Sequence, residues 1–321
     1  MISDRRREPK KLVRVVDEAY AAATGSNQKE DGLGLYKEYD RAGLDAQYNN
    51  RVRVPDHGDH IGRWAQASAR VRERGQAHLD VPYGTHPRQR FDIFPARAAL
   101  APALVYIHGG YWHMLDKSSF SFPATTMAEA GVAFAAVGYP LAPEFGVGDI
   151  VESLRQALVW LWRNGAEYGV DRDSLSVAGH SAGGHLAAMM METDWSKRGS
   201  DIPEHPIKGG TAISGIYDLE PIRLSYLNDV LGLDEETVKR NSPIHNMAAA
   251  AGPLNLAVGG RESDEFHRQQ RDIHGRWSGQ GLPGRSLDLP GHNHFSILDG
   301  LEDPTSELFR LVVETCLVNP Q

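Results

Sequence analysis

A lone serine stands between two glycines in the stretch AGHSAGGHLA, residues 178–187. Gly179, Ser181 and Gly183 fit the pattern G-x-S-x-G, with the apolar run LSVA before it and the run GGHLAAMMM after it. Between a strand and a helix, this pattern forms a strained turn that lifts the serine hydroxyl clear of a sheet. The alternative is a glycine-rich turn with an incidental serine. The strand and helix context favours Ser181 as a nucleophile.

A serine hydroxyl needs a neighbouring base, and in such folds the base comes late, in the order serine, acid, histidine. The last strand pattern ends in LPGHNHFSILDG, residues 289–300, which offers His292 and His294. We expect His294 to be the base because it lies deeper in the loop, whereas His292 directly follows a glycine at the strand end. The His-x-His spacing also suggests a metal site, but no further cluster of Cys, His and carboxylates supports one.

The acid that orients the histidine is expected after the preceding strand pattern, LNLAVGG. That loop, RESDEFHRQQ at residues 261–270, contains Glu262, Asp264 and Glu265. Asp264 and Glu265 fall where a helix would begin, and acidic residues stabilise a first helical turn. Glu262 is therefore the predicted acid, and Asp264 is the alternative that the sequence leaves open.

Backbone donors for a developing oxyanion are expected at two places. The run HGGYW, residues 108–112, follows the strand pattern ALVYI, and its glycines let the backbone approach a reacting carbonyl. A second donor is the first residue of the helix after the serine. The predicted oxyanion hole comprises Gly109, Gly110, Tyr111 and Ala182. Trp112 and His180 are the predicted substrate-binding side chains, with packing as the alternative role of each.

Alternating strands and helices must position these residues. Strand patterns occur at 77–84, 90–96, 103–110, 132–140, 175–181, 210–219, 254–260 and 286–291. Helix patterns occur at 149–169, 182–195, 266–280 and 305–318. Apolar strands that alternate with amphipathic helices predict an α/β fold with a mostly parallel sheet covered on both faces.

Two segments fall outside this alternation. Residues 1–75 are polar with helix-like spacing, in the runs DEAYAAATG, LYKEYDRAGLDAQYNNR and IGRWAQASARVRERG. An insertion at about 217–250 is long for a connection. We expect residues 76–321 to form the catalytic domain, and the insertion and the helical segment 1–75 to form a lid over the carboxyl edge of its sheet.

Composition excludes several classes of partner. The 321 residues carry 34 Lys and Arg against 42 Asp and Glu, a net charge of −8, without a basic patch at helical spacing, which argues against nucleic acid. We see no apolar run long enough for a membrane span and no secretory leader pattern at the start of the chain. Cys316 is the single cysteine and fits a buried structural thiol. We expect a cytoplasmic enzyme with a small-molecule substrate and no cofactor, and a homodimer is left open.

Six short runs together resemble a known family. HGGYW (108–112), DK (116–117), YPLAPE (139–144), GHSAGGH (179–185), EFHRQ (265–269) and HF (294–295) are similar to α/β-hydrolases of the kynurenine formamidase (arylformamidase) branch, close to the hormone-sensitive-lipase-like esterases. The resemblance covers about residue 80 to the end, and LDAQYNNR (44–51) loosely resembles a tyrosine-containing motif upstream in formamidases.

The resemblance implies an α/β-hydrolase fold without a metal. It implies nucleophile Ser181, histidine His294 and acid Glu262, where the family usually has aspartate. It also implies hydrolysis of N-formyl-L-kynurenine to formate and kynurenine. Three functions stay open: an aryl formamidase, a short-chain carboxylesterase with the same triad, and a non-catalytic binding protein.

Overall fold

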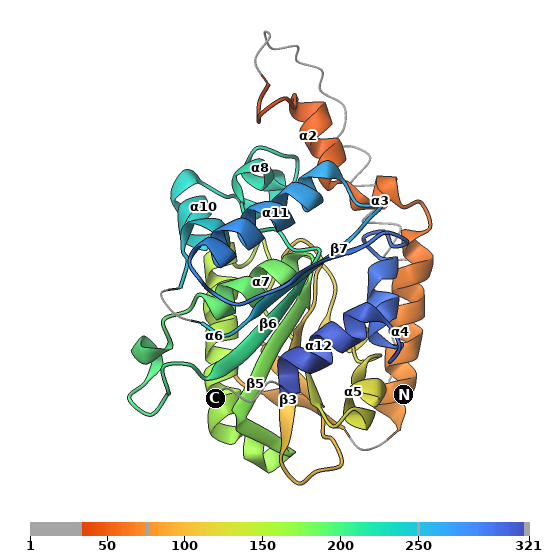
Figure 1. Cartoon of the computed structure of the whole chain (residues 1–321), viewed down its shortest axis with the longest axis vertical. Coiled ribbons are helices and arrows are strands. Elements are labelled where there is room, and N and C mark those ends of the chain that lie inside the picture. Colours follow the sequence, from red (N-terminus) through yellow and green to blue (C-terminus); the bar gives the residue numbers. More distant parts are fainter. Residues whose placement is uncertain (1–33, 75–76, 249–250, 318–321) are drawn as a thin grey trace, which may run out of the picture.

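One eight-stranded sheet forms the centre of the molecule, in the order β1-β2-β4-β3-β5-β6-β7-β8 (Figure 1). This computed structural model describes residues 34–74, 77–248 and 251–317. The strands are β1 (His78–Pro82), β2 (Arg90–Phe94), β3 (Ala101–Ile107), β4 (Ala133–Val137), β5 (Val170–His180), β6 (Ile207–Ile213), β7 (Leu254–Gly259) and β8 (Ser286–Leu289). Within this sheet β2 pairs antiparallel with β1 and β4, and the pairings from β4 through β8 are parallel.

The apolar runs of the sequence form the buried central strands. Every residue of β4 is buried, as are all residues of β3 except Pro102. Strands that are covered on both faces are apolar throughout rather than alternating, because neither face meets water. The expected mostly parallel, helix-flanked sheet is confirmed.

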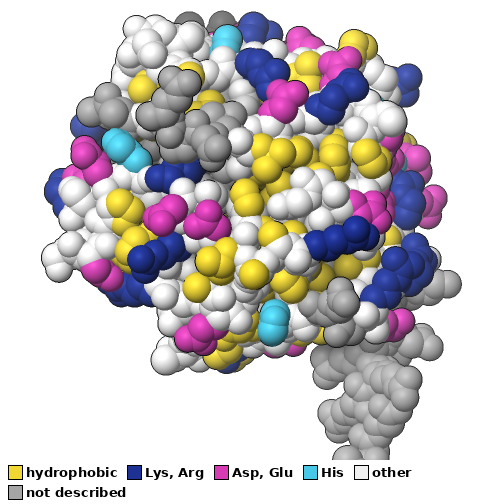
Figure 2. Space-filling model, turned by 60° about the horizontal axis from the view of Figure 1, so that its bottom comes forward, with side chains coloured by type: hydrophobic (Ala, Val, Ile, Leu, Met, Phe, Trp, Pro, Cys, Tyr) yellow, Lys and Arg dark blue, Asp and Glu magenta, His cyan; other side chains and the backbone are white. Residues whose placement is uncertain are grey.

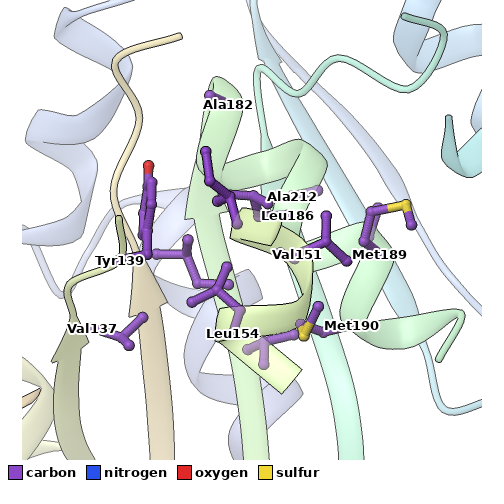
Figure 3. Close-up of a cluster of buried hydrophobic side chains, with 14 of the residues drawn as sticks. Val137, Tyr139, Val151, Leu154, Ala182, Leu186, Met189, Met190 and Ala212 are labelled. Carbon is purple, nitrogen blue, oxygen red and sulfur yellow. The ribbon is translucent and has the colours of Figure 1, made fainter. Parts of the chain in front are cut away.

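Helices cover both faces of the sheet. One core cluster joins α6 (Val147–Asn164), α7 (Ala182–Met191) and α11 (Asp264–Gly279) to the sheet, and the other joins α4 (His57–Glu73), α5 (Ala124–Glu129) and α12 (Glu307–Leu317). Figure 3 shows the first cluster, where Leu154 of α6 lies near Leu186 and Met190 of α7. Each such apolar side chain stabilises the fold by about 1.5–3 kcal/mol when it leaves water. This packing fixes α7, whose residues are all buried and which begins directly after Ser181.

Short helices from the N-terminal segment and from the insertion meet above the sheet. They are α2 (Arg41–Tyr48) and α3 (Asn50–Arg53) from the N-terminal segment, and α8 (Glu220–Arg223), α9 (Asn228–Leu231) and α10 (Glu235–Asn241) from the insertion (Figure 1). The carboxylate of Asp45 accepts a hydrogen bond from Tyr226 N at 2.8 Å, and Tyr36 Oη donates to Asp218 at 2.9 Å. The two expected lid segments are therefore in direct contact. The predicted helix in DEAYAAATG, residues 17–25, lies outside the described residues.

The face at the bottom of Figure 1 carries hydrophobic, basic and acidic side chains side by side. Figure 2 shows hydrophobic groups there interspersed with basic and acidic ones, without a continuous basic surface among the residues coloured in that view. Within the described ranges, no helix combines the length and the apolar character that crossing a membrane requires. Cys316 is buried in α12, and its burial raises the thiol pKa to about 12, so the thiol stays protonated.

Candidate active site

Ser181 occupies the sharp turn between β5 and α7. Its backbone has φ 58° and ψ −121°, a conformation that residues other than glycine rarely adopt. Glycine is required on both sides of this turn. A Cβ atom on Gly179 would lie 2.0 Å from the carbonyl oxygen of Gly183, and a Cβ atom on Gly183 would lie 2.0 Å from that of Ile107. The turn thus explains the sequence pattern and places Ser181 at the carboxyl edge of the sheet.

His294 lies in the loop after β8 and contacts a carboxylate. Its Nδ1 is 2.6 Å from Oε2 of Glu262, and both side chains are almost completely buried. A carboxylate accepts, so Nδ1 carries the hydrogen and the neutral ring keeps its acceptor lone pair on Nε2. The ring of Phe266 packs against the imidazole, with the centroids 4.8 Å apart. This tautomer is the one that a general base requires.

Glu262 lies in the turn after β7, and both of its carboxylate oxygens accept hydrogen bonds. Oε1 accepts from Ser214 Oγ at 2.6 Å and from Gly259 N at 2.8 Å, while Oε2 contacts His294. These hydrogen bonds fix the position of the carboxylate, so that Oε2 faces the imidazole of His294. Sequence reasoning missed Ser214. The available signal was a polar residue at the end of the apolar strand pattern GTAIS.

The alternative acids and the alternative histidine that the sequence suggested do not form this contact. Asp264 is exposed at the start of α11, and Glu265 forms a buried ion pair with Arg268, 2.7 Å from Oε1 to Nε. His292 contacts the backbone carbonyl of Ser296 through Nδ1 at 3.1 Å. Among these alternatives, the structure brings Glu262 and His294 together.

The HGGYW loop runs beside Ser181 with strained backbone. A Cβ atom on Gly109 would lie 3.1 Å from Cβ of Ser181 and 2.7 Å from the carbonyl oxygen of His180, so the glycine permits a close approach. Gly110 has φ 108°, and Tyr111 and Trp112 have φ 47° and 60°. A non-glycine residue in this region costs about 1–3 kcal/mol, so other contacts must hold the loop.

Two sets of hydrogen bonds hold that loop. Tyr111 Oη donates to the carbonyl of Tyr48 at 2.6 Å and lies 3.2 Å from Nδ2 of Asn50, which ties the loop to the N-terminal segment. On the other side, Trp112 Nε1 donates to Nδ1 of His185 at 3.1 Å. Sequence reasoning found neither tie, because the partners are more than 60 positions apart.

The two predicted substrate-binding side chains have different positions. Trp112 is fully buried in the core behind the loop, and its side chain does not line the cavity beside Ser181 that the described residues form. Packing, the alternative role, is what the structure shows for Trp112. His180 does line the cavity, and its Nε2 is 2.8 Å from the backbone carbonyl of His294.

A small cavity joins these groups. It has a volume of about 50 Å³ and contains Ser181 and His294 in its wall together with side chains from α3, α4 and the HGGYW loop. Its lining comprises Asn50, Arg51, Ile61, Trp64, Gly110, Tyr111, Met114, Leu115, Phe120, His180, Ser181, His294 and Phe295. This volume holds a few water-sized groups, so a short acyl group fits beside Ser181 and a larger leaving group must extend toward the opening. In the described part of the chain, no three His, Cys, Asp or Glu side chains are grouped to hold a metal ion.

Comparisons with known proteins agree with this architecture. The family described as BD-FAE matches residues 91–204. Kynurenine formamidase from Salmo salar is 33% identical over 286 residues, which covers 86% of this chain and 95% of that protein. Kynurenine formamidase from Danio rerio is 32% identical over 262 residues, covering 79% and 87%. A crystal structure of a Silicibacter protein, provisionally described as a thioesterase, superposes with TM-score 0.72 and 28% identity over 84% of this chain and 98% of that one.

Proposed function

Because the chain belongs to the kynurenine formamidase family of α/β-hydrolases, we propose that it is a serine hydrolase that removes a small acyl group from an aryl amide, with N-formyl-L-kynurenine as the first substrate to test. The observation that carries this proposal is the buried pair of His294 and Glu262, 2.6 Å apart, at the cavity that also contains Ser181. A histidine with this tautomer beside a strained serine supports nucleophilic catalysis.

In the proposed reaction, Oγ of Ser181 attacks the acyl carbonyl while Nε2 of His294 takes the hydroxyl proton. The negative charge that forms on the carbonyl oxygen is held by N–H groups of Gly109, Gly110, Tyr111 and Ala182. Glu262 stabilises the imidazolium electrostatically and keeps its own charge. His294 then protonates the departing aryl amine as the C–N bond breaks, which leaves the acyl group on Ser181.

Water completes the cycle. His294 takes a proton from a water molecule that attacks the acyl-serine carbonyl, and the ester bond to Ser181 breaks as the proton returns to Oγ. Formate leaves when the acyl group is formyl. The volume of about 50 Å³ beside the serine supports such a short acyl group.

We also propose that the N-terminal segment and the insertion form the cap of this site. Trp64 and Ile61 of α4 and Asn50 of α3 supply part of the cavity wall. The insertion contacts α2 rather than the cavity, through Tyr226 and Asp45. The N-terminal segment therefore closes the site, and the insertion supports that segment from the outer side.

A short-chain carboxylesterase is the second candidate. It needs the same triad, and the largely apolar cavity wall admits a short acyl ester as well as a formamide. A binding protein without activity does not need a buried glutamate that contacts a histidine through one oxygen and is held by two hydrogen bonds through the other. This arrangement therefore supports an enzyme.

Hydrolysis of N-formyl-L-kynurenine beside p-nitrophenyl acetate tests the proposal. We expect a higher kcat/KM for the formamide, with both activities lost in Ser181→Ala and with the fold of that variant checked by circular dichroism. Ester hydrolysis without formamide hydrolysis would support the carboxylesterase. Full activity of folded Ser181→Ala would overturn the serine mechanism.

A further inference from the structure

Tyr48, the last residue of α2, joins two parts of the proposed site that lie far apart in the sequence. Its side chain is completely buried, and its hydroxyl donates to Oε2 of Glu265 at 2.7 Å. Its backbone carbonyl accepts a hydrogen bond from the Tyr111 hydroxyl at 2.6 Å. These partners are 217 and 63 positions away from it. One residue of the N-terminal segment therefore contacts both α11 and the loop that carries proposed oxyanion donors.

The Glu265 end of this connection is fixed by charge and by hydrogen bonds. The Arg268 guanidinium donates to both carboxylate oxygens of Glu265, from Nε at 2.7 Å and from Nη2 at 2.8 Å. Gln269 Nε2 donates to the Tyr48 hydroxyl at 3.1 Å. Burial and the neighbouring Glu265 carboxylate hold the pKa of Tyr48 well above its ordinary value. The hydroxyl therefore keeps its hydrogen and donates it to Glu265 at neutral pH.

The helix that anchors Tyr48 also borders the proposed acid and base. Glu265 lies three positions after Glu262, and the ring of Phe266 packs against the ring of His294 with the centroids 4.8 Å apart. The ring of Phe266 also lies 5.8 Å from the ring of Tyr48. The Tyr48 carbonyl is thereby held at a fixed place relative to the acid and the base.

The loop at the other end needs such a fixed point because its backbone is strained. Tyr111 has φ 47°, and a residue in this region stays there only where surrounding contacts hold it. The Tyr111 hydroxyl donates its single hydrogen to the Tyr48 carbonyl and accepts from Nδ2 of Asn50 at 3.2 Å. Without the bond to Tyr48, the backbone of residues 110–112 can relax toward negative φ.

We propose that Tyr48 is a positioning residue for the oxyanion hole: anchored to Glu265, it holds Tyr111 so that the N–H groups of the loop face the reacting carbonyl. This inference rests on the proposed function in taking Ser181 as the nucleophile and the HGGYW loop as part of the oxyanion hole. Such donors stabilise an oxyanion because they are in place before the charge develops. Loosening Tyr48 therefore slows the chemical step and leaves binding of the uncharged substrate largely unchanged.

Removing single hydroxyl groups tests this connection from both ends. Tyr48→Phe deletes the bond to Glu265, and Tyr111→Phe deletes the bond to the Tyr48 carbonyl. Tyr83→Phe is the matched control, because the Tyr83 hydroxyl also donates to a backbone carbonyl at 2.6 Å, that of Gly138, and the two tyrosines are 8% and 7% exposed. The substrate is p-nitrophenyl acetate. Active sites are counted from the p-nitrophenolate that diethyl p-nitrophenyl phosphate releases, so inactive protein does not affect kcat.

The inhibition constant of phenyl trifluoromethyl ketone separates positioning from stability. In the expected adduct, Oγ of Ser181 bonds to the ketone carbon, the hydroxyl proton passes to His294, and the ketone oxygen becomes an anion in the oxyanion hole. The adduct thus carries the charge of the tetrahedral intermediate, which the free ester lacks. A variant that only destabilises the fold keeps the wild-type kcat per active site and the wild-type inhibition constant.

We expect Tyr111→Phe to lower kcat per active site by about 10- to 100-fold, because the loss of a whole oxyanion donor costs about 100- to 1,000-fold. The inhibition constant should rise by a similar factor, with little change in KM. Tyr48→Phe should act in the same direction but less strongly, because its carbonyl is kept. The double variant should lose little more than Tyr111→Phe, because losses along one chain of contacts are not additive. Tyr83→Phe should keep the wild-type values.

The proposal is overturned by an unchanged inhibition constant in folded Tyr48→Phe or Tyr111→Phe, by an equal rise in Tyr83→Phe, or by fully additive losses in the double variant. If Tyr48→Phe does not fold, Tyr111→Phe decides, because it deletes a contact of Tyr48 from the other side.

Failure of the proposed function gives different results. If the wild type cleaves the ester but not N-formyl-L-kynurenine, the formamidase assignment is wrong, and the ester and the ketone still decide the role of Tyr48. Full activity of folded Ser181→Ala would overturn the nucleophile and the positioning together. An inactive Ser181→Ala with an unchanged inhibition constant in Tyr111→Phe would overturn the positioning alone.

Discussion

The imidazole Nε2 of His180 donates a hydrogen bond to the backbone carbonyl of His294 across 2.8 Å. A carbonyl oxygen can only accept, so this contact assigns the hydrogen of a neutral His180 to Nε2. The two rings are 4.6 Å apart. Burial, together with the neighbouring charge of His294, holds the pKa of His180 well below its ordinary value. The residue before the proposed nucleophile thus holds the backbone of the proposed base and stays neutral beside it.

His180→Leu should lower kcat by about 10- to 100-fold with little change in KM, because a base displaced by as little as 1 Å loses rate at this scale. His180→Gln keeps an amide donor and should recover part of kcat. Steady-state kinetics with p-nitrophenyl acetate and thermal unfolding of each variant check this. An unchanged kcat in folded His180→Leu would show that the contact does not position His294.

Glu262→Ala should lower kcat by about 10³- to 10⁴-fold, because it removes the group that sets the His294 tautomer and stabilises the imidazolium. Asp264→Ala is the matched control: this carboxylate is exposed, two positions away on the same segment, and its loss should leave most of kcat. The kcat of both variants on N-formyl-L-kynurenine and on an ester shows which carboxylate is the acid of the triad. A severe loss in Asp264→Ala with a mild one in Glu262→Ala would reverse the assignment of the acid.

Acid should destabilise the fold through buried neutral histidines. Burial lowers the pKa of His108 and of His185 to about 4, against about 6.5 in the unfolded chain. Between these values the unfolded state binds more protons, so the free energy of unfolding falls as pH falls and is unaffected above about pH 6.5. Each histidine contributes a slope of up to about 1.4 kcal/mol per pH unit in this window.

Urea unfolding of His185→Gln at about pH 7 and about pH 5 measures that slope directly. The variant should show a weaker loss of stability between the two values than wild type. His205→Gln, which removes a histidine whose side chain is 49% exposed, should match wild type. Equal slopes in wild type and His185→Gln would contradict the prediction.

Two glycine-to-alanine substitutions should change the stability of the fold in opposite directions. Gly183→Ala places a methyl group 2.0 Å from the carbonyl of Ile107, so the turn that holds Ser181 must shift, and we expect a clear drop in melting temperature together with loss of activity. Gly62 lies within α4, and a Cβ atom added there would meet no atom of another segment within 4 Å. Gly62→Ala should therefore raise the free energy of unfolding by about 0.5–1 kcal/mol. Calorimetry of both proteins checks the signs, and a stabilised Gly183→Ala would refute the steric account of the turn.

Local patterns were enough to predict the scaffold. The apolar runs at 103–110 and 132–140 predicted β3 and β4, and the G-x-S-x-G pattern predicted a strained turn at Ser181 between β5 and α7. These features follow from periodicity and from steric demands between residues close in sequence, which the chain displays directly.

Contacts between distant segments decided the rest. The support of Glu262 by Ser214, the tie of Tyr111 to Tyr48 and the position of Arg51 in the cavity wall each join segments at least 48 positions apart. The large aromatic ring of Trp112 fits a substrate pocket and a core equally well by composition, and the fold placed it in the core. The sequence by itself determined the elements and the turn that presents Ser181. The tertiary structure alone decided which polar and charged side chains meet there, because a pairing across the fold leaves no period or spacing in either segment.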